Sequence, residues 1–454
     1  MDRDDLAFAG AARQAELVRR GEVSSAELVE LYLERIERFG PELNAFRTVM
    51  AERALADARQ ADARRGAGDE RPLLGVPIAV KDTEDVAGEH TAWGTAAHGG
   101  RAAGDNDLVA RLRSAGAVIL GKTNLPELAI IGDTEGPAFG VTRNPWDTDR
   151  SPGGSSGGSG AAVAAGLCAA ATASDGAGSI RIPAANCGLV GLKPQRDRVP
   201  MGALADHWYG LSVVGFLTRT VADTALLLEV GAAQPFVEAA RREPGRLRVA
   251  LSLKPPAPGP VDADVRASVE RVAEVLRTLG HEVVERDPAY GTAFAGALAR
   301  YLAGIAQDAE RFPRPERLQR RTRGFARLGS LIPGPVVERA RREEARHAAR
   351  IDELFRDHDL LLTPTTATPP VAAAAWEGMN ALRTLLGLAR AYPFTGIWNM
   401  TGQPALSIPA PPADGLPVGA QLIGPPDSEA RVLAAAAQLE RELGWPEHRP
   451  PLAA

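Results

Sequence analysis

One stretch of small residues, Ser151–Pro183, constrains the fold and chemistry of this chain more than any other. It begins with a glycine- and serine-rich segment at 151–160, continues through a thirteen-residue apolar run at 161–173, and closes with a second small-residue segment at 174–179. Glycine at this density permits positive φ angles and close backbone approach. The apolar run predicts a buried helix. We therefore expect two tight turns that present serine hydroxyls, with a helix between them.

The composition excludes several classes of protein. An apolar content of 45% and a charged content of 24% are typical of a soluble globular protein. The net charge of −5 gives no indication of a nucleic acid or an anionic membrane as partner. The longest apolar run is too short to span a bilayer, and the acidic N-terminus lacks the features of a signal peptide. Two cysteines, Cys168 and Cys187, cannot form a disulfide framework, so we expect a cytoplasmic protein.

Lysine is scarce in this chain. Only four of the 52 basic residues are lysine, namely Lys81, Lys122, Lys193 and Lys254. Positions that keep lysine are enriched for work that arginine cannot do, such as losing a proton. The apolar residues 73–80 predict a strand that ends at Lys81, and functional groups gather at such strand ends in open α/β sheets.

Strand and helix patterns alternate along the chain, which predicts an α/β protein with a largely parallel or mixed sheet. Residues 1–66 are predicted to be helical, with a capping box at Ser24–Glu27. Residues 247–285 predict a βαβ unit, and residues 290–357 are arginine-rich and helical.

Two short motifs match patterns whose structural context is wrong. Gly116–Thr123 fits the phosphate-binding pattern G-x-x-x-x-G-K-T, but its four intervening residues are an apolar strand instead of a glycine-rich loop. Gly153–Gly157 fits the nucleophile-elbow pattern G-x-S-x-G, but a loop precedes it where an elbow needs a strand. Spacings of histidine, cysteine and carboxylate suited to a metal are also missing, so we expect no metal and no cofactor.

Serine chemistry with a lysine base remains. Ser179 follows Asp175-Gly176-Ala177-Gly178, a turn whose backbone N–H groups can point at a developing oxyanion. The hydroxyl attacks only if a base removes its proton, and Lys81 can serve if burial lowers its pKa. A bridging hydroxyl would connect the two, and either Ser155 or Ser156 could supply it.

Several motifs together resemble the amidase signature family. They are GGSSGGS at 153–159, the 24-residue step from Ser155 to Ser179, GVPIAVKD at 75–82, GKTNLPE at 121–127, AFGVTRNPWD at 138–147, GLVGLKP at 188–194, TRTVADTALLL at 218–228 and TGQPALSIP at 401–409. The resemblance runs from about residue 15 to residue 445 and weakens over 240–355. It implies a large mixed central sheet covered by helices on both sides. With it we expect an N-terminal arm, 1–66, and a single domain, 67–454, in which 240–355 is a variable helical insertion on the substrate side.

The resemblance also implies roles for individual residues. Ser179 would be the nucleophile, Lys81 the base, and Ser155 the bridging serine, preceded by a cis peptide bond. The backbone N–H groups of Gly176, Ala177, Gly178 and Ser179 would form the oxyanion hole. The implied activity is hydrolysis of a carboxylic amide through a seryl acyl-enzyme, without a cofactor.

The substrate and partners are less constrained. We expect a small-molecule amide, with a homodimer left open. Two alternatives to hydrolysis also stay open: an amidotransferase A-type subunit that works with a partner protein, and a biosynthetic enzyme that passes its acyl group to an amine. Position near the motifs suggests an acyl pocket formed by Ile130, Ile131, Asp133, Trp208, Tyr209, Phe394 and Trp398.

Overall fold

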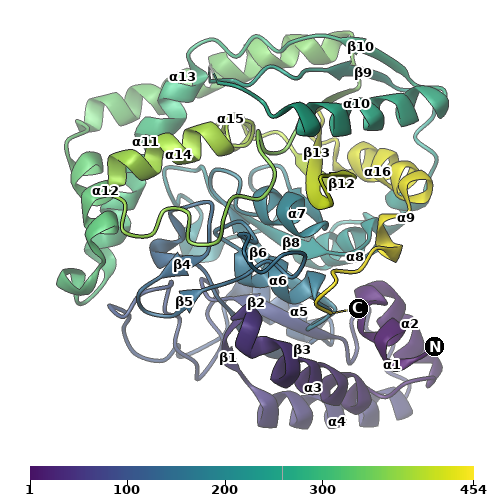
Figure 1. Ribbon diagram of the computed structural model, residues 1–454. Helices are drawn as coiled ribbons and strands as arrows, with labels where there is room; N and C mark the ends of the chain where they lie inside the picture. The colour runs from purple at the N-terminus through teal and green to yellow at the C-terminus, as the bar shows by residue number, and fades with distance from the viewer. Residues whose placement is uncertain (258, 454) are drawn as a thin grey trace.

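The computed structural model describes residues 1–257 and 259–453, which are built around one eleven-stranded sheet (Figure 1). In sheet order its strands are β1 (Phe46–Val49), β3 (Val118–Thr123), β2 (Pro77–Lys81), β6 (Ala170–Asp175), β8 (Val213–Thr218), β7 (Val190–Lys193), β12 (Ala405–Ala413), β13 (Leu416–Ile423), β11 (Leu360–Pro364), β9 (Arg248–Leu251) and β10 (Glu282–Glu285). The pairs β3–β2, β2–β6, β11–β9 and β9–β10 are parallel, and the others are antiparallel. The expected mixed α/β sheet is confirmed.

Helices pack on both faces of this sheet. Gly215 of β8 faces Ile180, just before α7, whereas the next residue, Phe216, packs against Gly231 of α8. Successive residues of a strand point to opposite faces, so α7 and α8 lie on opposite sides. The helices of the described chain are α1 (Arg3–Ala7), α2 (Gly10–Arg20), α3 (Ser25–Leu43), α4 (Ala51–Gly66), α5 (Asp107–Ser114), α6 (Gly157–Ala164), α7 (Arg181–Cys187), α8 (Val221–Ala232), α9 (Val237–Arg241), α10 (Ala263–Thr278), α11 (Ala293–Arg311), α12 (Arg320–Ser330), α13 (Gly334–Asp352), α14 (Ala381–Ala391), α15 (Gly396–Thr401) and α16 (Glu429–Leu443). Among the described residues, none of these helices combines the length and hydropathy needed to cross a membrane.

The prediction of one buried helix across 161–173 is wrong. Helix α6 ends at Ala164, and Gly166 adopts a left-handed conformation with φ of 62°. The chain then enters β6 at Ala170 and pairs with β2 and β8. Alanine-rich sequence suits either a helix or a buried strand, so tertiary hydrogen bonding decided the outcome. The two serine-bearing turns are therefore joined by a short helix and a central strand.

Residues 1–66 and residues 248–285 form the two edges of the central sheet. In residues 1–66 the predicted capping box is present at Ser24 and Glu27, but the same segment also supplies β1, which pairs with β3 at one edge. Residues 248–285 form the predicted βαβ unit, with β9 and β10 parallel at the other edge. The domain boundaries at 66, 240 and 355 stay a prediction.

Arg35 of α3 ties the N-terminal helices to the body of the molecule. Its buried guanidinium donates hydrogen bonds to the carbonyl oxygens of Gly166 (2.9 Å), Ala165 (3.1 Å) and Ala453 (3.0 Å), and it pairs with Asp4 (2.6 Å). One side chain thus satisfies backbone acceptors from two parts of the chain and pairs with a carboxylate from a third.

We expect Arg35→Met to lower the free energy of unfolding by about 2–4 kcal/mol, because three buried carbonyl groups lose their donor. Urea denaturation followed by circular dichroism measures the change. Arg38→Met, on the exposed side of the same helix, is the matched control and should cost less than about 1 kcal/mol. Equal losses for the two variants would contradict this interpretation of Arg35.

Candidate active site

The amine of Lys81 lies between two serine hydroxyls. Lys81 is the last residue of β2, and its Nζ donates hydrogen bonds to Ser155 Oγ and Ser174 Oγ, each at 2.8 Å. Ser155 lies just before α6, and the Gly154–Ser155 peptide bond is cis. The hydroxyl of Ser156 instead bonds to the backbone oxygen of Ser174 at 3.3 Å. The contact to Lys81 that the sequence left open between Ser155 and Ser156 is thus made by Ser155.

Burial lowers the pKa of Lys81 to about 7, although the negative charges of Glu84 and Asp175 oppose the shift. The side chain has no exposed surface, and removing an ammonium group from water favours its neutral form. The same burial raises the pKa of Glu84. Lys81 is therefore able to accept a proton near neutral pH.

Ser174 is a contact of Lys81 that sequence reasoning missed. Thr172 and Ser174 lie on the same face of β6, because side chains two residues apart point the same way. Thr172 Oγ1 accepts from the Lys81 backbone N–H at 2.8 Å, and Ser174 Oγ accepts from its Nζ. The parallel pairing of β2 with β6 brings these groups together. The alternation Thr-x-Ser directly before the second turn is the only sequence signal that could have indicated it.

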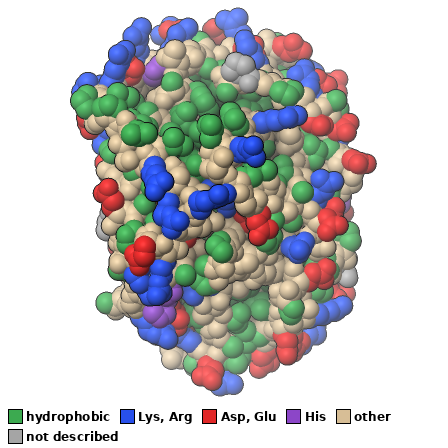
Figure 2. Space-filling view, turned by 60° about the vertical axis from the view of Figure 1, so that its left-hand side comes forward, with side chains coloured by type: hydrophobic (Ala, Val, Ile, Leu, Met, Phe, Trp, Pro, Cys, Tyr) green, Lys and Arg blue, Asp and Glu red, His purple; other side chains and the backbone are tan. Residues whose placement is uncertain are grey.

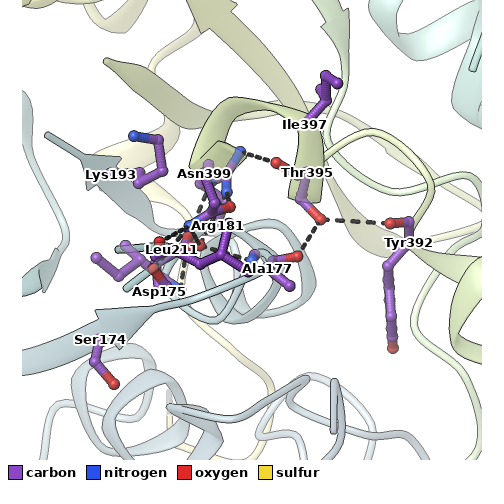
Figure 3. Close-up of polar contacts among 12 residues, drawn as sticks. Ser174, Asp175, Ala177, Arg181, Lys193, Leu211, Tyr392, Thr395, Ile397 and Asn399 are labelled. Atoms are coloured by element: carbon purple, nitrogen blue, oxygen red, sulfur yellow. Dashed lines mark hydrogen bonds and ion pairs between the residues drawn. The ribbon is translucent and has the colours of Figure 1, made fainter. Parts of the chain in front are cut away.

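A buried ion pair holds the turn that contains Ser179 (Figure 3). Arg181 donates from Nε and Nη2 to the two carboxylate oxygens of Asp175, each at 2.9 Å, and both side chains are fully buried. Asn399 donates to the Asp175 backbone oxygen at 2.7 Å and to its Oδ1 at 2.8 Å. Burial alone would raise the pKa of Asp175, but the charge and hydrogen bonds of Arg181 outweigh it and lower the pKa to about 2.

The turn divides the four N–H groups that the sequence proposed for an oxyanion hole. The N–H of Gly178 donates to Asp175 Oδ1 at 2.6 Å, and Gly178 has φ of 130°, a conformation that favours glycine. Among the described residues, none accepts a hydrogen bond from the N–H groups of Gly176, Ala177 or Ser179. The N–H groups of Gly176, Ala177 and Ser179 are thus available to a substrate, whereas that of Gly178 stabilises the turn.

Two cavities meet at Ser179 and share walls formed by Ala129, Gly176 and Trp208. One, which we call the apolar cavity, has a volume of about 120 Å³ and is lined by residues that include Ile130, Ile131, Leu298, Tyr301 and Leu388. The other, which we call the small cavity, has a volume of about 20 Å³ and is lined by polar residues that include Glu84, Ser155, Ser174 and His207, and by apolar residues that include Met201 and Leu204.

Three residues of the expected acyl pocket line the apolar cavity, namely Ile130, Ile131 and Trp208. The other four lie elsewhere in the described structure. Asp133 hydrogen-bonds the N–H of Thr134 and the hydroxyl of Ser151, and the Tyr209 hydroxyl accepts from Gln307. Phe394 and Trp398 are buried, and Trp398 packs against Tyr290 at 6.3 Å between ring centroids. Proximity to motifs in the sequence therefore identified three of the seven residues correctly as cavity lining.

Helices α11 and α14 supply much of the apolar cavity wall. Leu298 and Tyr301 come from α11, and Leu385 and Leu388 come from α14. Figure 2 turns the side of the molecule with α11, α12 and α14 toward the viewer and shows hydrophobic side chains gathered over its upper part. The sequence predicted the helical region 290–357, which contains α11, but it did not predict α14 or indicate which face of α11 meets the cavity.

Lys122 and Lys193 make contacts that support the fold. Lys122 is the second-last residue of β3, the strand of the apparent phosphate-binding pattern, and its Nζ pairs with Asp82 at 2.8 Å. Lys193 Nζ donates to the Pro194 backbone oxygen at 2.9 Å. Among the described residues, no group of three or more histidine, cysteine or acidic side chains is placed to hold a metal ion.

The chain is similar over nearly its whole length to several known proteins. The model of the family described as Amidase matches residues 27–433. A protein named "Putative amidase AmiB2" from Mycobacterium tuberculosis (strain ATCC 25618 / H37Rv) is 49% identical over 459 residues, covering 99% of each chain. The 6-aminohexanoate-cyclic-dimer hydrolase of Paenarthrobacter ureafaciens is 34% identical over 496 residues, covering 100% of this chain and 98% of that one. A solved structure of 6-aminohexanoate cyclic dimer hydrolase with substrate superposes with a TM-score of 0.90 at 32% identity, covering 99% of this chain and all of the other.

We expect Asp175→Asn to lower the free energy of unfolding by about 3–5 kcal/mol, because the buried Arg181 loses its counter-charge. Chemical denaturation monitored by tryptophan fluorescence measures the loss. Asp427→Asn removes a carboxylate that also pairs with an arginine, Arg198, but is exposed, and it should cost less than about 1 kcal/mol. Similar costs for the two variants would contradict a supporting role for the buried pair.

Proposed function

Because this chain belongs to the amidase signature family, we propose that it hydrolyses a carboxylic amide through a seryl acyl-enzyme, with Ser179 as nucleophile, Ser155 as relay and Lys81 as base. The observation that carries the proposal is the contact of the buried Lys81 amine with Ser155, beside a turn that presents Ser179 to a cavity.

The reaction begins with proton transfer. Neutral Lys81 takes the proton of Ser155, which in turn takes the proton of Ser179 as its hydroxyl attacks the amide carbon. Ser174 holds the Lys81 amine in place from the other side. The backbone N–H groups of Gly176, Ala177 and Ser179, for which the described residues offer no other acceptor, stabilise the oxyanion.

The same relay completes the turnover. The proton held by Lys81 returns through Ser155 to the departing amine, which leaves an ester on Ser179. A water molecule then attacks this ester and loses a proton to the relay. The relay returns that proton to Ser179 Oγ as the C–O bond to the serine breaks and the carboxylic acid leaves. The relatives compared above are named as an amidase and as cyclic-dimer hydrolases, which favours hydrolysis over the amidotransferase and biosynthetic alternatives.

Ser179→Ala should lower kcat/KM for amide hydrolysis by at least about 10³-fold, because it removes the nucleophile. Release of ammonia or amine from a panel of aliphatic, aromatic and peptide amides measures the loss. A fluorophosphonate probe should label the wild-type protein at Ser179 and leave the variant unlabelled, as intact mass and peptide mapping would report. A Ser179→Ala variant with wild-type turnover would contradict the proposal that Ser179 is the nucleophile.

The pH dependence should follow the protonation of Lys81. Since the neutral amine is the active form and its pKa is about 7, kcat/KM should rise about tenfold per pH unit below pH 7 and level off above it. Lys81→Arg cannot lose its proton and should remain inactive even at high pH. A kcat/KM that is flat from about pH 5 to about pH 9 would argue against a lysine base.

A further inference from the structure

We propose that Ser212, oriented by His207 and Asp308, binds the water molecule that hydrolyses the acyl-enzyme. The inference rests on the proposed function and adds a residue to its second half-reaction. It starts from three buried side chains that the relay of Lys81 and Ser155 does not use.

The three side chains form a hydrogen-bonded chain from α11 to the small cavity. Asp308 lies on α11, and its Oδ2 is 2.9 Å from His207 Nε2. His207 Nδ1 is in turn 2.7 Å from Ser212 Oγ. Both His207 and Ser212 line the small cavity, together with Ser155 and Ser179.

The pairing of β6 with β8 places Ser212 beside the turn that contains Ser179. Asp175, the last residue of β6, lies opposite Val213, the first residue of β8, in an antiparallel pair. Ser212 directly precedes Val213 and Gly176 directly follows Asp175, so Ser212 and Gly176 come together. A Cβ atom on Gly176 would lie 3.1 Å from Ser212 Oγ. The Ser212 hydroxyl thus approaches the backbone of the proposed oxyanion hole.

The partners of Asp308 determine the direction of each hydrogen bond in the chain. Trp208 donates its indole N–H to Asp308 Oδ2 at 2.7 Å, and Arg311 pairs with Oδ1 at 3.3 Å, so the carboxylate is an acceptor. His207 Nε2 must therefore donate to it. In a neutral imidazole, the usual form above about pH 7, the other nitrogen then accepts. The Ser212 hydroxyl consequently donates to His207 Nδ1.

Ser212 Oγ is left with unused acceptor capacity. A hydroxyl group has one hydrogen to donate and two lone pairs to accept with. The hydrogen goes to His207, and across residues 1–257 and 259–453 no other group forms a hydrogen bond with this oxygen. Ser212 therefore offers a hydrogen-bond acceptor to a molecule in the small cavity.

Ser212, His207 and Asp308 are the residue types of a serine hydrolase triad, but the backbone at Ser212 does not suit a nucleophile. A serine nucleophile uses nearby backbone N–H groups, its own included, to stabilise the oxyanion. The N–H of Ser212 donates to the His207 carbonyl oxygen at 3.4 Å, whereas no described residue accepts from the N–H of Ser179. We therefore keep Ser179 as the nucleophile and assign Ser212 a binding role.

The attacking water has two hydrogens, and the site offers an acceptor for each. Ser155 lines the small cavity and not the apolar one, so the amine leaves and the water enters on the small-cavity side, with the acyl group on the other. As the water oxygen bonds to the acyl carbon, one proton passes to Ser155 and the second O–H donates to Ser212. The C–O bond to Ser179 then breaks, and Ser179 Oγ takes the proton back from the relay. The second hydrogen leaves on the carboxylic acid.

Methanol distinguishes this role from general support of the fold. It has a single O–H, whose proton must pass to Ser155. A methanol molecule that attacks the same ester therefore has no hydrogen left for Ser212. Loss of the Ser212 hydroxyl should slow hydrolysis and leave methanolysis unchanged, whereas a distorted cavity would slow both reactions.

The test uses the full-length protein and p-nitrophenyl hexanoate at about pH 8, with and without methanol. The nitrophenolate leaving group has no N–H, so Ser212 takes no part in acylation. Hydrolysis of the acyl-enzyme is the slow step for such an activated ester, and kcat reports it. We expect Ser212→Ala to lower kcat by about tenfold, the effect of one hydrogen bond, and to leave kcat/KM within about twofold. The ratio of methyl hexanoate to hexanoic acid should rise by about tenfold.

A second variant and a control accompany Ser212→Ala. In Asp308→Asn the amide N–H can donate to His207 Nε2, which moves the imidazole hydrogen to Nδ1 and removes the acceptor of the Ser212 hydroxyl. The product ratio should rise by about tenfold here as well. Ser268→Ala, in α10, is the matched control, because it removes a buried hydroxyl that donates to the Asp264 backbone oxygen at 2.9 Å. It should leave kcat and the product ratio within about twofold.

The product ratio is set within the active fraction of the protein, so it does not depend on how much of a variant folds. A ratio in Ser212→Ala within about twofold of the wild-type ratio would overturn the proposal. If Ser212→Ala yields no active protein, the ratio in Asp308→Asn decides in the same way.

Labelling distinguishes failure of this inference from failure of the proposed function. If the fluorophosphonate probe labels Ser179 and the product ratio does not change in the variants, the role of Ser212 is wrong and the acyl-enzyme mechanism stands. If the wild-type protein takes no label and releases no nitrophenolate, the proposed function fails, and this inference fails with it.

Discussion

The amine of Lys81 is held in a place that water does not reach, and the arrangement of the site depends on that fact. An ammonium group buried this deeply loses its hydration, so its proton is weakly held. The two hydroxyl groups that replace water, from Ser155 and Ser174, come from segments about twenty residues apart in the chain. Only the parallel pairing of β2 with β6 and the helix before it bring both within 2.8 Å of one nitrogen. The central sheet thus determines the surroundings of the Lys81 amine, and with them its pKa.

Asp175 is also buried, but unlike Lys81 it keeps its charged form. Asp175 keeps its negative charge in the interior because Arg181 and Asn399 satisfy its oxygens. Its carboxylate also accepts a hydrogen bond from the N–H of Gly178, whose φ of 130° favours glycine. One charged pair therefore shapes the turn, whereas the neutral amine of Lys81 carries out proton transfer. The two groups stay distinct because each has its own set of partners.

Sequence reasoning reached the groups that lie within motifs and missed those that depend on tertiary contacts. Lysine retention at a strand end indicated Lys81, and the second glycine-rich turn indicated Ser179. The choice of Ser155 over Ser156 came from the resemblance to the amidase signature family. Ser174 depends on the register between two strands, and Tyr301 depends on how a helix packs more than a hundred residues away. The apolar run at 161–173 was misjudged because alanine suits a helix and a buried strand equally. Trp398 and Asp133 illustrate the same limit, since closeness in sequence to a motif does not determine the direction of a side chain.

The proposed catalytic residues and much of the cavity wall come from different segments of the chain, so substrate preference can change while the catalytic residues stay the same. Lys81, Ser155 and Ser179 belong to strands and turns in the first half of the chain, whereas α11 and α14 furnish much of the wall that the acyl group would meet. Replacements on those two helices alter the shape of that wall without disturbing the proton path. Trp208 differs from the residues of α11 and α14, because it lines both cavities. A substitution at Trp208 would therefore change the shape of both cavities. A related enzyme with such a substitution would need a second, compensating substitution to keep one cavity unchanged.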